Sequence, residues 1–210
     1  MDTIEQLRWR YATKKFDKNK KLSKLKIDTL KEAFNLTAMS FGLQPISMVV
    51  VSNNKLKESL VPYAYNQKQV SDASHLLVIC IQSDVNEEDV NKHFDNVKMI
   101  RNTPETILEP YRKNLIKTIQ KMSVEERKIW SINQAYIALG NLMTVCAFEE
   151  IDSCPMEGFI SEKYDEILNL RGMGLKSVLL LPVGYRAEDD MFASFKKVRK
   201  SLDKTIIELN

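Results

Sequence analysis

Histidine and cysteine are scarce in this sequence, and their scarcity excludes several kinds of catalytic site. There are only two histidines, His75 and His93, and three cysteines. His75 enters an apolar segment, which favours a structural role, and His93 lies in a polar segment, where we expect it to be solvated. The cysteines have the spacing of neither a zinc site nor a disulfide framework, so we interpret them as buried thiols in a reducing compartment. With both histidines interpreted in this way, the sequence offers no good candidate for the base of a serine or cysteine catalytic triad.

Common nucleotide-binding and hydrolytic motifs are also missing. The chain contains no GxGxxG, no GxxxxGK[ST], no GxSxG and no HExxH. Its longest apolar runs, such as residues 76–81, are too short to span a bilayer, and its first residues lack the basic and apolar regions of a secretory signal. We therefore expect a cytoplasmic protein with no membrane segment.

Charge and composition place few further limits on function. The net charge of +3, with 44% hydrophobic and 28% charged residues, is ordinary for a globular protein. Such a small net charge does not favour nucleic-acid binding, which concentrates positive charge on one face. Because the 210 residues contain no repeat, low-complexity segment or linker, we interpret residues 1–210 as a single domain.

Two basic clusters lie near opposite ends of the chain. In residues 8–16, arginines and lysines alternate with aromatic and small residues, and no acidic residue is present. Residues 196–200, Lys-Lys-Val-Arg-Lys, form the second cluster. If folding brings the clusters together, they can hold an anion and support a flat aromatic ligand. On composition alone, two solvated charge runs are the more frequent explanation.

The apolar pattern predicts both strands and helices. Residues 76–82 are apolar on both faces, which predicts a central strand. Polar residues 86–122 predict a pair of helices with breaks at residues 103–104 and at Pro110. We expect this pair to project from the core and to cover another part of the protein. Further strands are expected at 46–52 and 177–183, and helices at 3–10, 22–39, 56–65 and 161–170.

Local signals lead to three more specific predictions. Ile4 and Leu7 should face the core from the first helix. Pro45 should hold Gln44 in an extended conformation within the loop of residues 40–45. The final residues, 205–209, have the pattern of an edge strand that could pair with another subunit's sheet.

The clearest helix signal follows a capping box. Ser123 and Glu126 have the Ser-x-x-Glu spacing, and residues 129–148 are apolar on nearly every side. In a chain of this size, a helix buried all round suggests a subunit partner as well as the chain's own sheet. We expect Ala138 to lie in that interface.

Five segments together resemble the successive motifs of a known family. They are residues 10–16, 40–45, 66–67 with 72–75, 155–159 and 197–199, and they occur in order over almost the whole chain. The set is similar to the FMN-dependent nitroreductases, with the best match in the branch of oxygen-insensitive NAD(P)H nitroreductases and dihydropteridine reductases. One such motif alone would be weak evidence for the family, whereas five motifs in the same order and at compatible spacings make a chance match improbable.

The resemblance implies an α+β, nitroreductase-like three-layer fold with a central, mostly antiparallel sheet flanked by helices. It implies an intertwined homodimer with FMN bound at the subunit interface and NAD(P)H as co-substrate. The C-terminal segment would reach the partner subunit and add to its sheet.

Roles for charged residues also come from the resemblance. Arg10, Lys197 and Arg199 would hold the FMN phosphate. Lys14 would reach the pyrimidine end of the isoalloxazine, where a cation stabilises the anionic reduced flavin and raises its potential. No metal and no essential protein acid–base group is implied.

Contacts with the rest of the flavin are implied in the same way. Tyr11 and Ala12 would lie along the ribityl chain and ring edge by backbone contact, and Asn66 would hydrogen-bond to the pyrimidine edge. A backbone N–H of Glu157 or Gly158 would lie near N5. The other residues implied at the cofactor are Pro155 and Met156 on one ring face, Gln69 near the flavin, and Met39, Ser40 and Phe41 from the partner subunit.

This chain departs from the family pattern at three places. Tyr11 and Ala12 stand where many relatives have His-Ser or Arg-Ser, Gln69 replaces a second lysine of some relatives, and Ile46 replaces a common tryptophan. These departures bear on the flavin potential and therefore on the preferred acceptor.

The implied activity is ping-pong electron transfer: NAD(P)H passes hydride to FMN, and the reduced flavin then reduces nitroaromatics, quinones or related acceptors by two electrons. One alternative is a flavin-binding or flavin-sequestering protein without turnover, in which residues 86–121 cover the ring. A nucleic-acid-binding module is a third reading, disfavoured by the low aromatic content of 8%.

Overall fold

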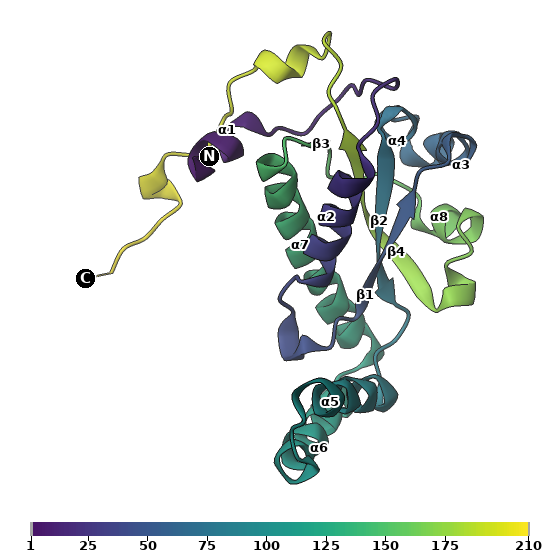
Figure 1. The fold of residues 1–210 in the computed structure, drawn as a ribbon, viewed down its shortest axis with the longest axis vertical. Helices are drawn as coiled ribbons and strands as arrows, with labels where there is room; N and C mark the ends of the chain where they lie inside the picture. Colours follow the sequence, from purple (N-terminus) through teal and green to yellow (C-terminus); the bar gives the residue numbers. More distant parts are fainter. Residues whose placement is uncertain (1, 210) are drawn as a thin grey trace.

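A four-stranded antiparallel sheet lies at the centre of the computed structural model, which describes residues 2–209 (Figure 1). The strand order is β1-β2-β4-β3, so β2 is central, as its apolar sequence predicted. β3 was not expected, because two residues are too short to show an alternating pattern. The strands are β1 (Ile46–Val51), β2 (His75–Gln82), β3 (Asp152–Ser153) and β4 (Leu175–Gly184).

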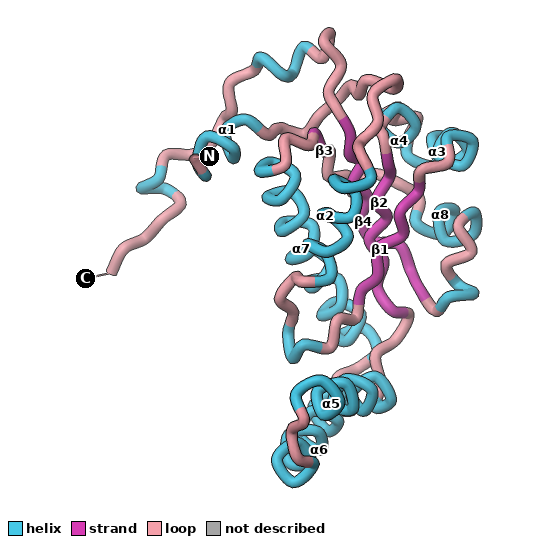
Figure 2. Tube along the Cα trace, in the orientation of Figure 1, coloured by secondary structure: helices cyan, strands magenta, loops and turns pink. Residues whose placement is uncertain are grey.

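Helices cover both faces of this sheet and produce three layers (Figures 1 and 2). One face packs against α2 (Lys24–Asn35) and α7 (Val124–Phe148), and the other packs against α3 (Asn54–Leu60), α4 (Gln69–Asp72) and α8 (Ser161–Ile167). Alternate residues of β2 serve the two cores, as the two-residue period of a strand requires. Leu77, Ile79 and Ile81 join the first core, and Leu76, Val78 and Cys80 join the second.

Helix α7 begins at the predicted capping box. The Ser123 hydroxyl accepts a bond from the Glu126 N–H at 3.2 Å, and the Glu126 carboxylate accepts one from the Ser123 N–H at 2.7 Å. The prediction that Ala138 lies at a subunit interface is wrong, because this residue is fully buried against the chain's own sheet. The opposite face exposes Ile129, Tyr136 and Ile137 by 51%, 44% and 50%.

Helices α5 (Glu87–Arg101) and α6 (Glu105–Lys121) form the predicted projecting pair (Figure 1). The predicted break at residues 103–104 is confirmed, and it begins one residue earlier at Asn102, which has the left-handed conformation; Pro110 does not break α6 and lies inside it. The pair has a small core of its own rather than a shared one, which explains why it projects. That core consists of Val90, Phe94, Leu108, Leu115 and Ile119.

The two histidines both have packed surroundings. The rings of His93 and Phe94 make an edge contact at 5.4 Å, and a Cβ at Gly42 would lie 3.0 Å from the His93 ring. The expectation that His93 is solvated is therefore wrong, and burial lowers its pKa. His75 is half-buried and shares a hydrogen bond of 2.9 Å with the Ser74 hydroxyl, in agreement with a structural role.

Two local predictions near the N-terminal half are wrong. Helix α1 (Thr3–Trp9) buries no residue, and Ile4 and Leu7 are 52% and 38% exposed, because α1 lies beyond the edge of the sheet (Figure 1). Gln44 has a φ of +47° instead of an extended backbone. Its side-chain amide donates to the Asn35 carbonyl at 2.9 Å, so it closes the end of α2, which stops four residues before the expected Met39.

After β4 the chain extends away from the sheet and passes beside α1 (Figure 1). Residues 205–209 form no strand within the single chain, so their addition to a partner's sheet stays a prediction. Within residues 2–209, no helix combines the length and apolar character needed to cross a membrane. Short 3-10 helices are η1 (Ser40–Gly42), η2 (Val61–Ala64), η3 (Arg171–Met173), η4 (Met191–Ser194) and η5 (Leu202–Lys204).

Candidate functional site

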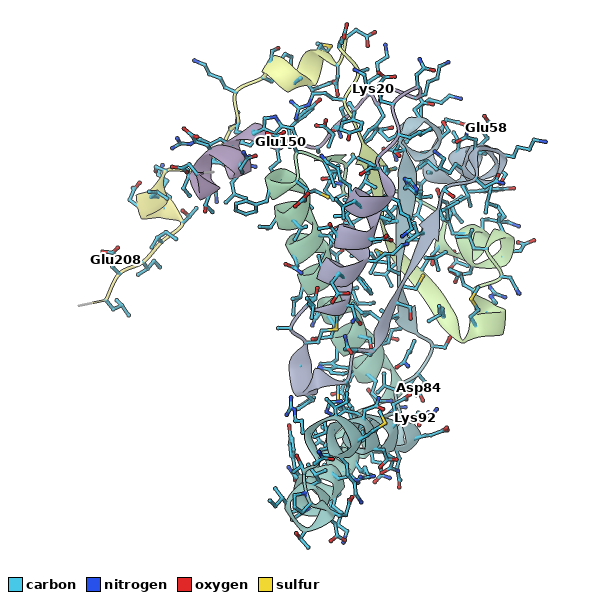
Figure 3. The ribbon with its side chains drawn as sticks, viewed as in Figure 1. Lys20, Glu58, Asp84, Lys92, Glu150 and Glu208 are labelled. Atoms are coloured by element: carbon cyan, nitrogen blue, oxygen red, sulfur yellow. The ribbon has the colours of Figure 1, made fainter. Side chains whose placement is uncertain are left out.

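The two basic clusters meet where the C-terminal segment passes α1. The Lys197 ammonium donates a hydrogen bond to the Arg10 carbonyl, across almost the whole chain. Partial burial of the Lys197 ammonium lowers its pKa, and so do the neighbouring guanidinium groups of Arg10, Arg199 and Arg186. Figure 3 draws the side chains of this region, with Glu150 marking the end of α7 beside α1. Folding thus gathers several cations in one place.

Three of these cations have no acidic partner. Among residues 2–209, no carboxylate lies within ion-pair distance of Arg10, Lys197 or Arg199. Most basic residues on a protein surface can find a counterion or separate from one another, so a converging, unneutralised group is suited to an external anion. Arg199 and Lys197 are exposed, and Arg10 is half-buried.

Arg186 belongs to the same cationic group but has a structural partner. Its backbone N–H and Nε donate to the Asp152 carboxylate at 2.8 and 2.7 Å. Its guanidinium carbon lies 4.4 Å from the centre of the Trp9 ring and 4.7 Å from that of the Tyr11 ring. Since Trp9 and Tyr11 flank Arg10 in sequence, Arg186 fixes the chain on both sides of that arginine. Sequence reasoning missed this residue.

A buried carboxylate, Asp190, binds the N-terminal motif from the other side. Its Oδ2 accepts hydrogen bonds from the Tyr11 hydroxyl at 2.8 Å and from the N–H groups of Lys14 and Lys15 at 2.9 and 3.0 Å. Burial opposes ionisation of Asp190, but these bonds outweigh it and lower the pKa of the carboxyl. Burial and the bond to Asp190 raise the pKa of Tyr11. The Tyr11 hydroxyl is thus engaged inside the protein.

The side chain of Lys14 remains free. It is exposed, and within the part of the chain that the structure describes it forms no ion pair, whereas the adjacent Lys15 pairs with Asp189. The residues before it are anchored to the sheet: Ala12 bridges Ser153 of β3, and the Thr13 N–H donates to the Ser153 carbonyl at 3.1 Å. The Lys14 ammonium therefore extends from a rigid backbone.

Two loops expected to contact the flavin ring are joined to each other. The Gln67 amide donates to the Gly158 carbonyl at 3.1 Å, which connects the loop of Asn66 to residues 155–158. Asn66 is exposed and has a φ of +57°, and the preceding Tyr65 has a φ of +52°. Two consecutive residues in this uncommon conformation hold Asn66 in a defined position. Gln69 is nearly buried at the start of α4.

Residues 155–158 present backbone donors to the surface. Met156 anchors the loop, because its side chain is buried and its backbone pairs in both directions with Leu180 at 2.9 and 3.0 Å. Among residues 2–209, the backbone N–H groups of Glu157 and Gly158 have no hydrogen-bond acceptor. The Glu157 carboxylate accepts a bond from the Tyr136 hydroxyl at 2.8 Å, which raises the pKa of Tyr136. Pro155 is half-buried beside them.

Residues 39–41 are not brought to this site within the single chain. Helix η1, which contains Ser40 and Phe41, lies toward the opposite end of α7 from the basic clusters (Figure 1). Gln134 holds it there, because its side chain accepts a bond from the Ser40 N–H at 2.9 Å. Phe41 is exposed with a φ of +58°, and Met39 is half-buried. An approach from a partner subunit stays a prediction.

Comparison with known proteins places this architecture in a family. Residues 7–185 match the model of the Nitroreductase family. The chain therefore belongs to the Nitroreductase family, and both the predicted resemblance and the three-layer α+β fold are confirmed.

Individual relatives cover nearly the whole chain. It is 34% identical to a Staphylococcus epidermidis protein that is provisionally named an NAD(P)H nitroreductase, with 97% of this chain and 94% of that protein covered. It is 27% identical to the oxygen-insensitive NAD(P)H nitroreductase of Salmonella typhimurium, with 100% of both covered.

A solved structure shares the fold. A provisionally named nitroreductase from Exiguobacterium sibiricum, in complex with FMN, superimposes with a TM-score of 0.84 and 18% identity. The match covers 100% of this chain and 98% of that one.

Proposed function

We propose that this protein is an FMN-dependent oxidoreductase that takes hydride from NAD(P)H and reduces nitroaromatics, quinones or related acceptors by two electrons. The observation that carries the proposal is the convergence of Arg10, Lys197 and Arg199, which have no acidic partner among residues 2–209, in a member of the Nitroreductase family. The names of its relatives support NAD(P)H as donor, and the FMN complex of a structural neighbour supports the cofactor.

The donors present fit the chemistry of FMN. A phosphate monoester carries a charge of about −1.5 to −2 at neutral pH and accepts several hydrogen bonds, so three cations suit it. The free N–H groups of Glu157 and Gly158 could donate to a ring atom, and Asn66 offers an amide to the pyrimidine edge. FMN, when bound, supplies the hydride-accepting and electron-donating chemistry.

Each protein group then has a physical role in that site. Arg10, Lys197 and Arg199 bind the phosphate and set the position of the cofactor. Lys14 directs a positive charge to the pyrimidine end, where negative charge develops on reduction, so it favours the reduced state over the oxidised one. No side chain is required to transfer a proton in this reaction. This agrees with the surroundings of the two histidines, since His75 bonds to Ser74 and His93 packs against Phe94.

Two chains form the functional unit in this proposal. The exposed face of α7, with Ile129, Tyr136 and Ile137, provides an apolar surface for a second copy. Within residues 2–209, β1 pairs only with β2, so its outer edge can accept the C-terminal segment of the partner. Met39, Ser40 and Phe41 then reach the partner's flavin. Three free, buried cysteines support a reducing, cytoplasmic location.

Anaerobic reduction of the bound flavin tests the activity and its main alternative. We expect the yellow protein to lose its visible absorption on addition of NADH or NADPH and to regain it on addition of a nitroaromatic or a quinone. A flavin that stays oxidised with both nicotinamides would support the sequestering alternative instead.

A further inference from the structure

Asp190 is a buried acid outside the motifs that the sequence identified. Only 5% of its surface is exposed, and it accepts four hydrogen bonds. Three come from Tyr11, Lys14 and Lys15 to Oδ2, and the fourth comes from the Phe192 N–H to Oδ1 at 3.1 Å. A buried carboxylate with this many donors is rigidly held and also holds its donors rigidly.

These bonds join the two segments that the proposed site needs. On one side, two consecutive peptide N–H groups fix the backbone at Lys14, whose side chain is free. On the other side, Asp190 caps η4, the short helix that precedes Lys197 and Arg199. The Asp190 carboxylate accepts hydrogen bonds from peptide and hydroxyl donors. Within residues 2–209 it forms no ion pair that would neutralise Lys14.

We propose that Asp190 is a positioning residue, which directs the Lys14 ammonium toward the flavin and aligns the two phosphate-binding segments. This inference rests on the proposed FMN function. It makes a counterintuitive prediction about charge. A carboxylate near the flavin should by itself disfavour the anionic reduced form, so removal of its charge should raise the midpoint potential. If Asp190 acts through Lys14, its removal should lower the potential.

The test is a redox titration of bound FMN in the wild type, Asp190→Asn and Asp189→Asn. Asp189 is the matched control, since it carries the same charge one residue away but is exposed and, within residues 2–209, its side chain pairs only with that of Lys15. We expect Asp190→Asn to lower the midpoint potential and to weaken FMN binding, because the two phosphate-binding segments lose their common anchor. A loss of about tenfold would correspond to about 1.4 kcal/mol. Asp189→Asn should leave the potential unchanged or raise it.

An unchanged or raised potential in Asp190→Asn would overturn the proposal. If Asp190→Asn does not fold, Tyr11→Phe removes one bond to the carboxylate and keeps its charge, and it should lower the potential by a smaller amount. An unchanged potential in Tyr11→Phe would then overturn the proposal. A wild type that binds no FMN would refute the proposed function itself, and this inference with it.

Hydrogen exchange of the flavin-free protein gives a second readout. The Lys14 and Lys15 amides should be protected in the wild type and in Asp189→Asn, and should exchange faster in Asp190→Asn. Equal exchange in all three proteins would contradict a positioning role even where FMN binds normally.

Discussion

The Lys197 ammonium donates a hydrogen bond to the backbone carbonyl of Arg10, 187 residues earlier in the chain. This contact brings two basic clusters from opposite ends of the sequence into one site. Within residues 2–209 no carboxylate pairs with Arg10, Lys197 or Arg199, whereas Lys15 and Arg186 pair with Asp189 and Asp152, so the charges of the first three remain available to a ligand. The geometry is that of an anion site built by the folded chain.

The phosphate role of Arg199 predicts selective loss of FMN affinity. Arg199→Ala should weaken FMN binding about ten- to a hundredfold, because a charge-assisted bond to phosphate is worth roughly 1.5–3 kcal/mol. Riboflavin, which has no phosphate, should bind equally to wild type and variant. Fluorescence titrations measure both affinities. Lys200→Ala removes the same charge from the next residue and serves as the control; an equal loss in the two variants would mean that only net charge matters.

The role assigned to Lys14 predicts a change in redox behaviour without loss of cofactor. Lys14→Met should lower the midpoint potential of bound FMN and slow its reduction by NAD(P)H, while Arg10, Lys197 and Arg199 keep FMN bound. Lys18→Met, which removes an exposed lysine four residues away, should leave both quantities unchanged. Stopped-flow absorbance and a redox titration provide the measurements. If Lys14→Met behaves like Lys18→Met, then Lys14 does not contact the flavin.

The exposed face of α7 predicts the location of the dimer interface. Ile137→Glu should place an unpaired charge between subunits and should yield a monomer with little FMN, as judged by light scattering and the visible spectrum. Met173→Glu makes a similar change on η3, on the opposite layer of the fold, and should remain dimeric. An Ile137→Glu protein that stays a dimer with bound FMN would place the interface elsewhere.

Lys57 predicts an unusual dependence of stability on pH. It is fully buried, donates to the carbonyls of Ala73 and Ser74, and has its pKa lowered by burial to about 8 from the usual 10.5. Between about pH 8 and 10.5 the unfolded chain binds more protons at this lysine than the folded chain, so its contribution to the free energy of unfolding rises with pH. Below about pH 8 the destabilising effect of its burial is constant.

Denaturant unfolding at fixed protein concentration can isolate this effect. Between about pH 8 and 10.5, the free energy of unfolding of the wild type should rise by about 1–3 kcal/mol relative to that of Lys57→Met, since each pKa unit corresponds to about 1.4 kcal/mol. The same comparison with Lys55→Met, which replaces an exposed lysine, should show no relative change with pH. Parallel pH profiles for wild type and Lys57→Met would show that Lys57 titrates normally.

Features of the fold with a local cause were predictable from the sequence. The strands β1, β2 and β4 follow from short apolar runs, and α7 follows from the Ser123–Glu126 capping box. The orientation of α1 was not predictable, because two apolar residues in a seven-residue helix do not distinguish a surface that faces the core from one that faces outward. Likewise, the apolar character of α7 did not reveal that Ala138 faces inward.

Within the candidate site, the cationic residues were identified, whereas their supports were not. Asp152 and Arg186 are separated by 34 residues, and Asp190 is 179 residues from Tyr11, so no spacing rule links them. Their signal was indirect: aromatic residues on both sides of Arg10 need something to pack against. Only the fold shows that Arg186 packs against both rings and that Asp190 accepts a hydrogen bond from the Tyr11 hydroxyl.

The most direct test of the central claim is a titration of the flavin-free protein with FMN and with riboflavin, followed by visible absorbance and fluorescence. The account predicts one FMN bound per chain, and riboflavin binding weaker by at least about a hundredfold, since about 1.4 kcal/mol corresponds to each factor of ten and several charge-assisted phosphate bonds are lost. A protein that takes up no FMN, or that binds FMN and riboflavin equally, would contradict it.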